Sequence, residues 1–228
     1  TWYATHPQSF YRTGMPTPDF PGLARNARQT ATGTPHIHFN GAGGNIGAGK
    51  WNDGARKNRK LLADRVAAGM AKAWKNTTKH PLSPKDVAWS VVPVELPPSE
   101  HLDATRLKQA LANEKAKPSD RFFAAKNLDW LQRCERGDGI GISCLTVGRA
   151  RVLHLPGELF VEYQLNAQKL RPDLFVAMAA YGDYAPGYIG TEIGYAQGGY
   201  ETSPGASKTA PQVEAVLMGA VKKLLARE

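Results

Sequence analysis

The sequence predicts an α/β fold, a mixed α+β layered domain in which a β-sheet is flanked by helices. Strand-like runs rich in Val and Ile alternate with amphipathic helical runs, the pattern of a layered domain. Residues 150–182 read as strand, helix and strand, which predicts a right-handed crossover between two parallel strands. The 228 residues, 42% of them hydrophobic, suffice for a single domain spanning 1–228 with its own core.

The N-terminal third predicts two strands and one long helix. TWYAT (1–5) alternates like a strand, and residues 7–34 are expected to form a long loop rich in Pro, Gly and Thr. TPHIHFNGAG (34–43) is a second strand that breaks into a glycine run. Asp53 is expected to cap a helix over about 54–76. Its apolar stripe is Leu61, Leu62, Val66, Met70, Ala73 and Trp74.

The remaining chain alternates between strands and helices. DVAWSVVPVELP (86–97) is a strand in which Pro93 indicates an edge position or a bulge. Ser119 is expected to cap the second of the next two helices, and Gly148 to form a turn between two strands. In order, the expected elements are helices 103–115 and 119–135, strands 139–147 and 150–155, helix 156–170, strand 174–182 and a closing helix 211–228.

The net charge of +9 is concentrated in one region. Residues 50–79 hold nine Lys or Arg and two Asp. The basic face of helix 54–76 is either a solvated helix face or a contact for anionic polymers or membrane surfaces. No aromatic residues alternate with the charges on that face, so no specific nucleic-acid partner is predicted.

Several features bear on the compartment. No apolar run is long enough to span a membrane, and no secretory signal opens the sequence. TWYAT resembles the end of an element, so we expect an upstream segment to be missing. Cys134 and Cys144 flank a turn-rich segment, where a disulfide and two free thiols fit equally well.

The stretch 181–203, YGDYAPGYIGTEIGYAQGGYETS, is the most unusual part of the chain. It is rich in Gly and poor in aliphatic residues, so neither a helix nor a strand is expected there. A long ordered loop is either functional or a rigid surface loop packed by its own aromatic rings. It holds five of the eight tyrosines: Tyr181, Tyr184, Tyr188, Tyr195 and Tyr200.

Polar residues follow three predicted strands at the point where each ends. His6 follows TWYAT, Glu158 follows ARVLHLPG, and the tyrosine-rich stretch follows LFVAMAAYG. Ligands bind at strand ends in open α/β sheets, so these side chains predict a metal site with nitrogen and oxygen ligands. The alternatives are that Glu158 balances the dipole of a helix in its first turn, and that His6 is an ordinary loop histidine.

The glycine run GAGGNIGAGK raises the question of a phosphate-binding loop. Gly44, Gly49 and Lys50 match the G-x-x-x-x-G-K spacing, but Trp51 stands where the Mg²⁺-binding hydroxyl should be. No nucleotide cofactor is predicted.

These same residues resemble the neutral/alkaline, non-lysosomal ceramidases. PGELF (156–160) followed by YIGTEIGYAQGGYE (188–201) matches the family's P-G-E-F and Y-I/V-x5-Y-x4-Y-E segments. YATHPQSFYRTG resembles its histidine-bearing segment, and HFNGAGGNIGAGKWN its N-x-G-D-x-S-P-N segment. The resemblance is strong over residues 1–52 and 152–205. It implies that the chain is the C-terminal portion of a ceramidase-like catalytic domain, secreted or periplasmic.

The resemblance implies a zinc-dependent hydrolase of an amide, such as an N-acyl lipid, with metal-activated water as nucleophile. It assigns Zn²⁺ to His6, Glu158 and Tyr188. The residues that hold the loop around them would be Tyr195, Tyr200 and Glu201.

Two departures from the family pattern stand out. Its first zinc histidine belongs upstream, so an N-terminal segment or a second chain would complete the site. His36 and His38 are conceivable substitutes, but they precede the glycine run and are expected to lie within the strand instead. Aligning Asn45 with the family asparagine places Lys50 where the family serine stands. We therefore expect Lys50 and Asn45 to take catalytic roles, with Lys50 near the developing oxyanion. A non-catalytic module using basic helix 54–76, or a degenerate relative, is the alternative.

Overall fold

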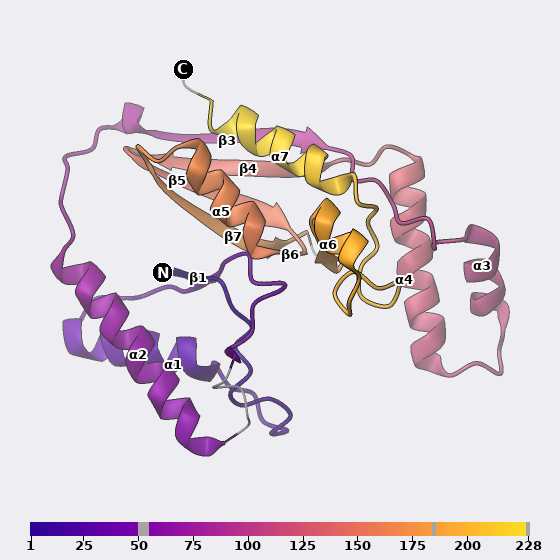
Figure 1. Ribbon diagram of the computed structural model, residues 1–228, viewed down its shortest axis with the longest axis horizontal. Helices are drawn as coiled ribbons and strands as arrows, with labels where there is room; N and C mark the ends of the chain where they lie inside the picture. Colours follow the sequence, from indigo (N-terminus) through magenta and orange to yellow (C-terminus); the bar gives the residue numbers. More distant parts are fainter. Residues whose placement is uncertain (50–54, 184–185, 227–228) are drawn as a thin grey trace.

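The centre of the molecule is a four-stranded mixed sheet in the order β3-β4-β5-β7 (Figure 1). The computed structural model describes residues 1–49, 55–183 and 186–226. The strands are β3 (Val87–Val94), β4 (Ile140–Val147), β5 (Ala150–Pro156) and β7 (Phe175–Gly182). The first three pair antiparallel, while β5 and β7 are parallel. The predicted α/β class and the parallel pair are confirmed.

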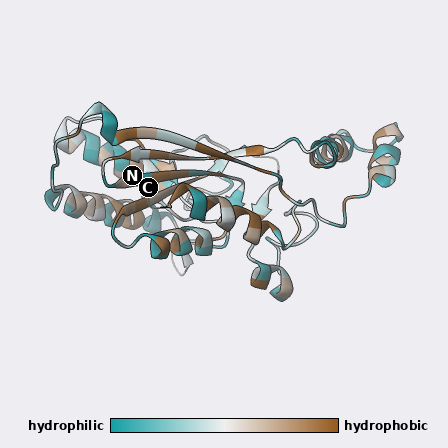
Figure 2. Cartoon of the chain, turned by 90° about the horizontal axis from the view of Figure 1, so that it is seen from above, coloured by the Kyte–Doolittle hydropathy of each residue, from teal (hydrophilic) through white to brown (hydrophobic). Residues whose placement is uncertain are grey.

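Two helices cover one face of this sheet. They are α5 (Val161–Leu170), which connects β5 to β7, and α7 (Val213–Leu224) (Figure 1). Ile142, Leu153 and Met178 lie beneath them with no exposed surface. The strands are coloured largely as hydrophobic in Figure 2, as expected where a sheet face packs on helices.

Strand β3 is an edge strand, as Pro93 predicts, because it pairs only with β4. A 3₁₀ turn, Pro84–Asp86, precedes it. Its alternate residues Val87, Trp89 and Val91 are each at least half exposed. The apolar composition of this strand therefore does not reflect full burial.

The N-terminal region contains β1 (Trp2–Tyr3), which pairs in parallel with β2 (Phe39–Asn40), and two helices. The prediction of a continuous loop over 7–34 is wrong, because α1 occupies Asp19–Thr32. This helix buries Phe20 and Ala24, and its few apolar residues do recur at helical spacing. Most of it is polar, however, and Pro21 and Gly22 stand in its first turn, so the segment resembles a loop in composition. Polar hydrogen bonds to the buried Asp19 hold its start.

Helix α2 (Arg56–Lys75) packs on α1. Its predicted cap, Asp53, lies outside the described residues. The predicted apolar stripe is only partly buried: Leu62 contributes to the cluster with Phe20, whereas Trp74 is 53% exposed. Only part of this apolar stripe is therefore covered by the rest of the protein.

Helices α3 (Ala104–Ala112) and α4 (Pro118–Glu135) form a hairpin at one end of the molecule (Figure 1). The prediction that Ser119 caps α4 is wrong, because α4 begins at Pro118, whose fixed φ and missing N–H favour the first helical position. The Trp130 indole donates a hydrogen bond to Lys208 O at 3.1 Å and joins α4 to the body.

Three short elements replace structures predicted otherwise. The predicted helix 156–170 begins only at Val161, because Glu158–Leu159 forms strand β6. The tyrosine-rich stretch contains β8 (Tyr188–Ile189) and helix α6 (Glu192–Gln197), so the prediction of no helix or strand there is wrong. Thr191 caps α6 by accepting from the Gly194 N–H.

Three further predictions concern the C-terminal part. The closing helix α7 ends at Leu224, short of the predicted end, and residues 227–228 lie outside the described part. Cys134 and Cys144 are both free thiols. No helix in the described part of the chain has the length and apolarity to span a membrane.

Candidate metal centre

Glu158 and Tyr188 are brought together by backbone pairing between β6 and β8. The two residues are register partners in this parallel pair. The Glu158 N–H donates to Gly187 O at 2.9 Å, and the Phe160 N–H donates to Ile189 O at 3.1 Å. Since Glu158 lies in a strand, the alternative that it balances a helix dipole in the first helical turn is wrong.

The glycine of the PGE segment is required by the backbone. Gly157 has a φ of +63°, which L side chains rarely adopt. A Cβ at this position would lie 2.6 Å from Gly187 O. Gly157 therefore lets β6 approach β8 closely and sets where Glu158 emerges.

His6 approaches this pair from the N-terminal region. Its Nε2 lies 3.2 Å from Glu158 Oε2 and 3.1 Å from the Tyr188 hydroxyl. Its Nδ1 lies 3.2 Å from Ile46 O, and its backbone N–H donates to the same oxygen at 2.8 Å. A carbonyl oxygen only accepts, so Nδ1 carries a proton and Nε2 faces the two oxygen-bearing groups.

The glycine run forms the bridge between these two parts of the chain. The Gly44 N–H donates to Leu159 O at 2.7 Å, and a Cβ on Gly44 would lie under 3.0 Å from the carbonyl oxygens of Glu158 and Leu159. Gly43 likewise packs against the backbone of Thr5. Sequence reasoning tested this run for phosphate binding and missed this role, although consecutive glycines are themselves a signal of close backbone approach.

The three side chains are partly buried and electrostatically coupled. The exposed fractions of the His6 and Glu158 side chains are 19% and 13%. The hydrogen bond with Glu158 raises the pKa of His6 above its ordinary value, against the opposing effect of burial. Burial, and next the charge of Glu158, raise the pKa of the Tyr188 phenol. The phenol is therefore protonated at neutral pH.

The donor set fits a zinc ion. Tetrahedral zinc with bonds to nitrogen and oxygen of about 2.0–2.2 Å places its ligand atoms about 3.3 Å apart. The distances of 3.2 and 3.1 Å from His6 Nε2 are close to that separation. Within the described residues no group of three or more His, Cys, Asp or Glu side chains is positioned to hold a metal, so the set depends on the phenol.

The tyrosines predicted to support the loop differ in their contacts. The Tyr200 ring meets the Tyr188 ring edge-on at 6.0 Å between centroids, but Tyr200 is 69% exposed. The Tyr195 hydroxyl hydrogen-bonds to Ser207 Oγ and Thr209 Oγ1 at 2.7 and 2.8 Å. Glu201 lies in the turn that follows Tyr200. Tyr200 thus contacts the proposed ligand Tyr188 directly. Tyr195 anchors the same segment through its hydrogen bonds to Ser207 and Thr209.

Asn45 lies beside the centre and contacts the start of α5. Its Oδ1 accepts from the Val161 N–H at 2.9 Å, and its Nδ2 donates to Glu162 Oε2 at 2.9 Å. Both ends of the amide are therefore engaged with the helix that follows Glu158. Lys50, Asn52 and Tyr184 lie outside the described residues.

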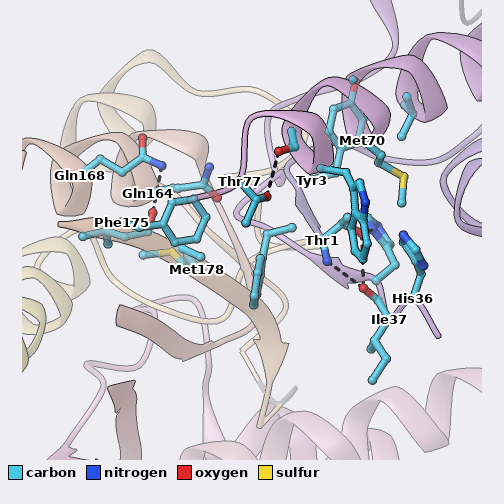
Figure 3. A pocket seen from close by; sticks show the side chains of 18 of the residues that line it. Thr1, Tyr3, His36, Ile37, Met70, Thr77, Gln164, Gln168, Phe175 and Met178 are labelled. Carbon is cyan, nitrogen blue, oxygen red and sulfur yellow. Dashed lines mark hydrogen bonds between the residues drawn. The ribbon is translucent and has the colours of Figure 1, made fainter. Parts of the chain in front are cut away.

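His36 and His38 do not join the centre. They line a separate cavity of about 840 Å³ between β1, α2, α5 and β7 (Figure 3). The His36 Nδ1 lies 2.7 Å from Thr34 O, and the His38 Nδ1 lies 3.1 Å from Thr1 Oγ1. Among the described residues neither forms a metal group with His6, which agrees with the expectation that they do not substitute for the upstream histidine.

Comparison with solved structures places the whole chain in one fold. The neutral ceramidase from Pseudomonas aeruginosa matches with a TM-score of 0.65 and 15% identity, over 99% of this chain and 43% of that one. A ceramidase complexed with C2 matches with a TM-score of 0.66 and 14% identity, over 97% and 45%. The chain has the fold of neutral ceramidases and spans less than half the length of these two structures.

Sequence comparisons give no match. No protein-family profile matches the chain, and no curated protein matches it significantly. The resemblance to ceramidases, predicted from a few short segments, is confirmed by the solved structures at the level of the fold.

Proposed function

We propose that this chain is part of a ceramidase-like, zinc-dependent hydrolase that cleaves an amide in an N-acyl lipid or another acyl substrate. The observation that carries the proposal is the convergence of His6, Glu158 and Tyr188 on one point from two distant parts of the chain. The neutral-ceramidase fold supports it. The proposed location, secreted or periplasmic, follows from the same resemblance.

Each of the three side chains makes a different contribution to holding the metal. When bound, zinc supplies Lewis acidity that polarises a carbonyl group and lowers the pKa of a water molecule. His6 offers the lone pair of Nε2, because Ile46 O fixes the proton on Nδ1. Glu158 supplies the negative charge and Tyr188 a third ligand oxygen. Three protein ligands suffice to hold a catalytic zinc ion and leave a position for water, so this chain is expected to bind zinc by itself. A further ligand from an N-terminal segment or a second polypeptide would complete the site.

Four other residues complete the proposal. Tyr200 and Glu201 keep the loop around Tyr188 in place, and Asn45 orients the chain next to Glu158 through its contacts with α5. Lys50 stabilises negative charge on the substrate oxygen. Full hydrolysis of an N-acyl substrate by a Lys50→Ala variant would remove Lys50 from this scheme.

Metal analysis of the purified chain tests the centre directly. We expect equimolar zinc in the wild type, and Glu158→Gln or His6→Ala to weaken zinc binding by more than about a hundredfold, beyond the effect of losing an outer-shell partner. Glu135→Gln is the control, because this carboxylate is exposed at the end of α4 and has no part in the site. A zinc-free wild type, or equal loss in the Glu158 and Glu135 variants, contradicts the proposal.

The alternative function is a non-catalytic module that binds anionic polymers or membranes through α2. Helix α2 buries only Asn58, Leu62 and Ala63, and its Lys and Arg residues are exposed except Arg59, which donates to Ser9 O. This function requires salt-sensitive binding that falls in a Lys72→Gln/Lys75→Gln variant and is independent of zinc.

A further inference from the structure

The α3–α4 hairpin projects from the body of the molecule at the end away from α1 and α2 (Figure 1). Helix α3 has no buried residue, and α4 buries only Ala124, Trp130 and Leu131. Two of these three lie in its C-terminal half, where the Trp130 indole is bonded to Lys208 O. The opposite end, residues 113–123, is the hairpin tip.

The hairpin tip carries two adjacent, exposed aromatic side chains. Phe122 is 64% exposed and Phe123 is 56% exposed. Their rings contact each other edge-on, with centroids 5.7 Å apart. Exposed apolar side chains that occur singly are ordinary, but two phenylalanines together at a projecting tip mark a contact surface.

Basic residues lie close to this aromatic pair in the sequence. The tip itself, residues 113–123, holds three Lys or Arg and two Asp or Glu, a net charge of +1, and the whole hairpin segment 103–126 has a net charge of +3. Among the described residues no acidic group pairs with the three cations of the tip. These are Lys115, Lys117 and Arg121.

We propose that the hairpin tip docks this protein on anionic lipid bilayers. Phe122 and Phe123 enter the boundary between headgroups and acyl chains, as apolar residues of interfacial helices do. Lys115, Lys117 and Arg121 lie beside the anionic headgroups. A lipid surface fits better than a protein groove or a nucleic acid, because the hairpin projects from the body and phenylalanine has no polar atom to hydrogen-bond to a partner.

The proposal is independent of the metal centre. None of the hairpin residues belongs to the set of His6, Glu158 and Tyr188. Membrane docking and zinc binding therefore fail separately, and variants of the tip are expected to bind zinc as the wild type does.

Vesicle co-sedimentation of the 228-residue chain tests the aromatic pair. Vesicles of phosphatidylcholine and phosphatidylglycerol in equal parts are compared with phosphatidylcholine alone. We expect Phe122→Ser/Phe123→Ser to lower partitioning to the anionic vesicles by about tenfold, and Phe122→Trp/Phe123→Trp to retain it, since Trp favours the interface. Val87→Ser/Val91→Ser is the control, because these side chains on β3 are similarly exposed but lie outside the hairpin.

A second pair of variants tests the charges. Lys115→Gln/Lys117→Gln is expected to lower binding to anionic vesicles by about fivefold or more and to flatten its salt dependence. Lys72→Gln/Lys75→Gln on α2 removes the same charge elsewhere and is expected to change binding much less.

Each contrary outcome overturns the proposal. These outcomes are equal loss in the Phe and Val variants, loss in the α2 variant alone, or unchanged partitioning after both tip variants. Binding of the tip to single-stranded oligonucleotides, with no binding to anionic vesicles, also overturns it. Circular dichroism and zinc content of each variant separate loss of docking from loss of folding.

Discussion

The sheet region and the N-terminal region of this molecule are held together by different means. The sheet and its two helices share one continuous core that includes Ile142, Leu153 and Met178. The N-terminal helices share a cluster of Phe20, Leu62 and Ala63, with polar contacts and close backbone packing beside it. The candidate metal centre combines His6 from the N-terminal region with Glu158 and Tyr188 from segments next to the sheet. If these residues hold a metal as proposed, metal binding is expected to tie the N-terminal region, which has the smaller core, to the sheet region.

The largest expected effect on the free energy of unfolding comes from a cavity in the core of the sheet region. Leu153 has no exposed surface, so Leu153→Ala leaves a cavity and lowers the free energy of unfolding by about 3–5 kcal/mol. Leu62→Ala in the N-terminal cluster removes the same atoms at 8% exposure and is expected to cost about 2 kcal/mol. Urea denaturation of both variants measures the difference. Equal losses would show that the two cores are equally consolidated.

The next effect concerns the buried carboxylate of the N-terminal region. Asp19 accepts hydrogen bonds from the backbone N–H groups of Ser9, Phe10 and Phe20 and from the Ser9 hydroxyl. Asp19→Ala leaves these donors without their acceptor and is expected to lower stability by about 2–4 kcal/mol.

Asp19→Asn is the matched control for this prediction. It keeps one acceptor oxygen and tolerates the positive φ of 48° at this position, so it is expected to lose less than half as much. Hydrogen exchange should localise the difference to residues 9–32. A loss spread evenly over the sheet would contradict a separate N-terminal unit.

A third change acts at the junction of the two regions. A Cβ on Gly44 overlaps the carbonyl oxygens of Glu158 and Leu159, so Gly44→Ala is expected to cost about 1–3 kcal/mol and to weaken zinc binding. The junction, rather than either core, is what this variant disturbs. Zinc titration and thermal unfolding together check it, and unchanged zinc affinity would remove the glycine run from the metal site.

The smallest effect is a gain. Gly69 lies within α2, and a Cβ there meets nothing within 4 Å. Gly69→Ala is therefore expected to stabilise the N-terminal region by about 0.5–1 kcal/mol through helix propensity. Slower hydrogen exchange in α2 is the measurement. A loss of stability would indicate that α2 does not tolerate a side chain at this position.

The same contrast explains how much of the fold the sequence predicts. The central strands, the crossover and the closing helix follow from hydrophobic periodicity, and Pro93 marks the edge of the sheet. Helix α1 is missed because its polar composition, with Pro21 and Gly22 in the first turn, resembles a loop and outweighs the helical spacing of its few apolar residues. Strand β6 is missed because a two-residue parallel pairing depends on a partner 30 residues away.

The candidate site divides in a similar way. Strand ends and short family-like segments are local features, and they predict His6, Glu158 and Tyr188, which the structure brings together. The supporting backbone is not local: Ile46 O fixes the histidine tautomer, and Gly44 sets the distance between the two regions.

The pairing of β6 with β8 gives the site a discrete character. Side chains alternate between the two sides of a strand, so a slip of one residue in β8 would bring Gly187 or Ile189 opposite Glu158 in place of Tyr188. No small adjustment lies between these registers. The two-residue pairing therefore either places the Tyr188 phenol beside Glu158 and His6 or removes it completely. Insertions or deletions before β8 are expected to preserve the candidate site only when they restore the same register.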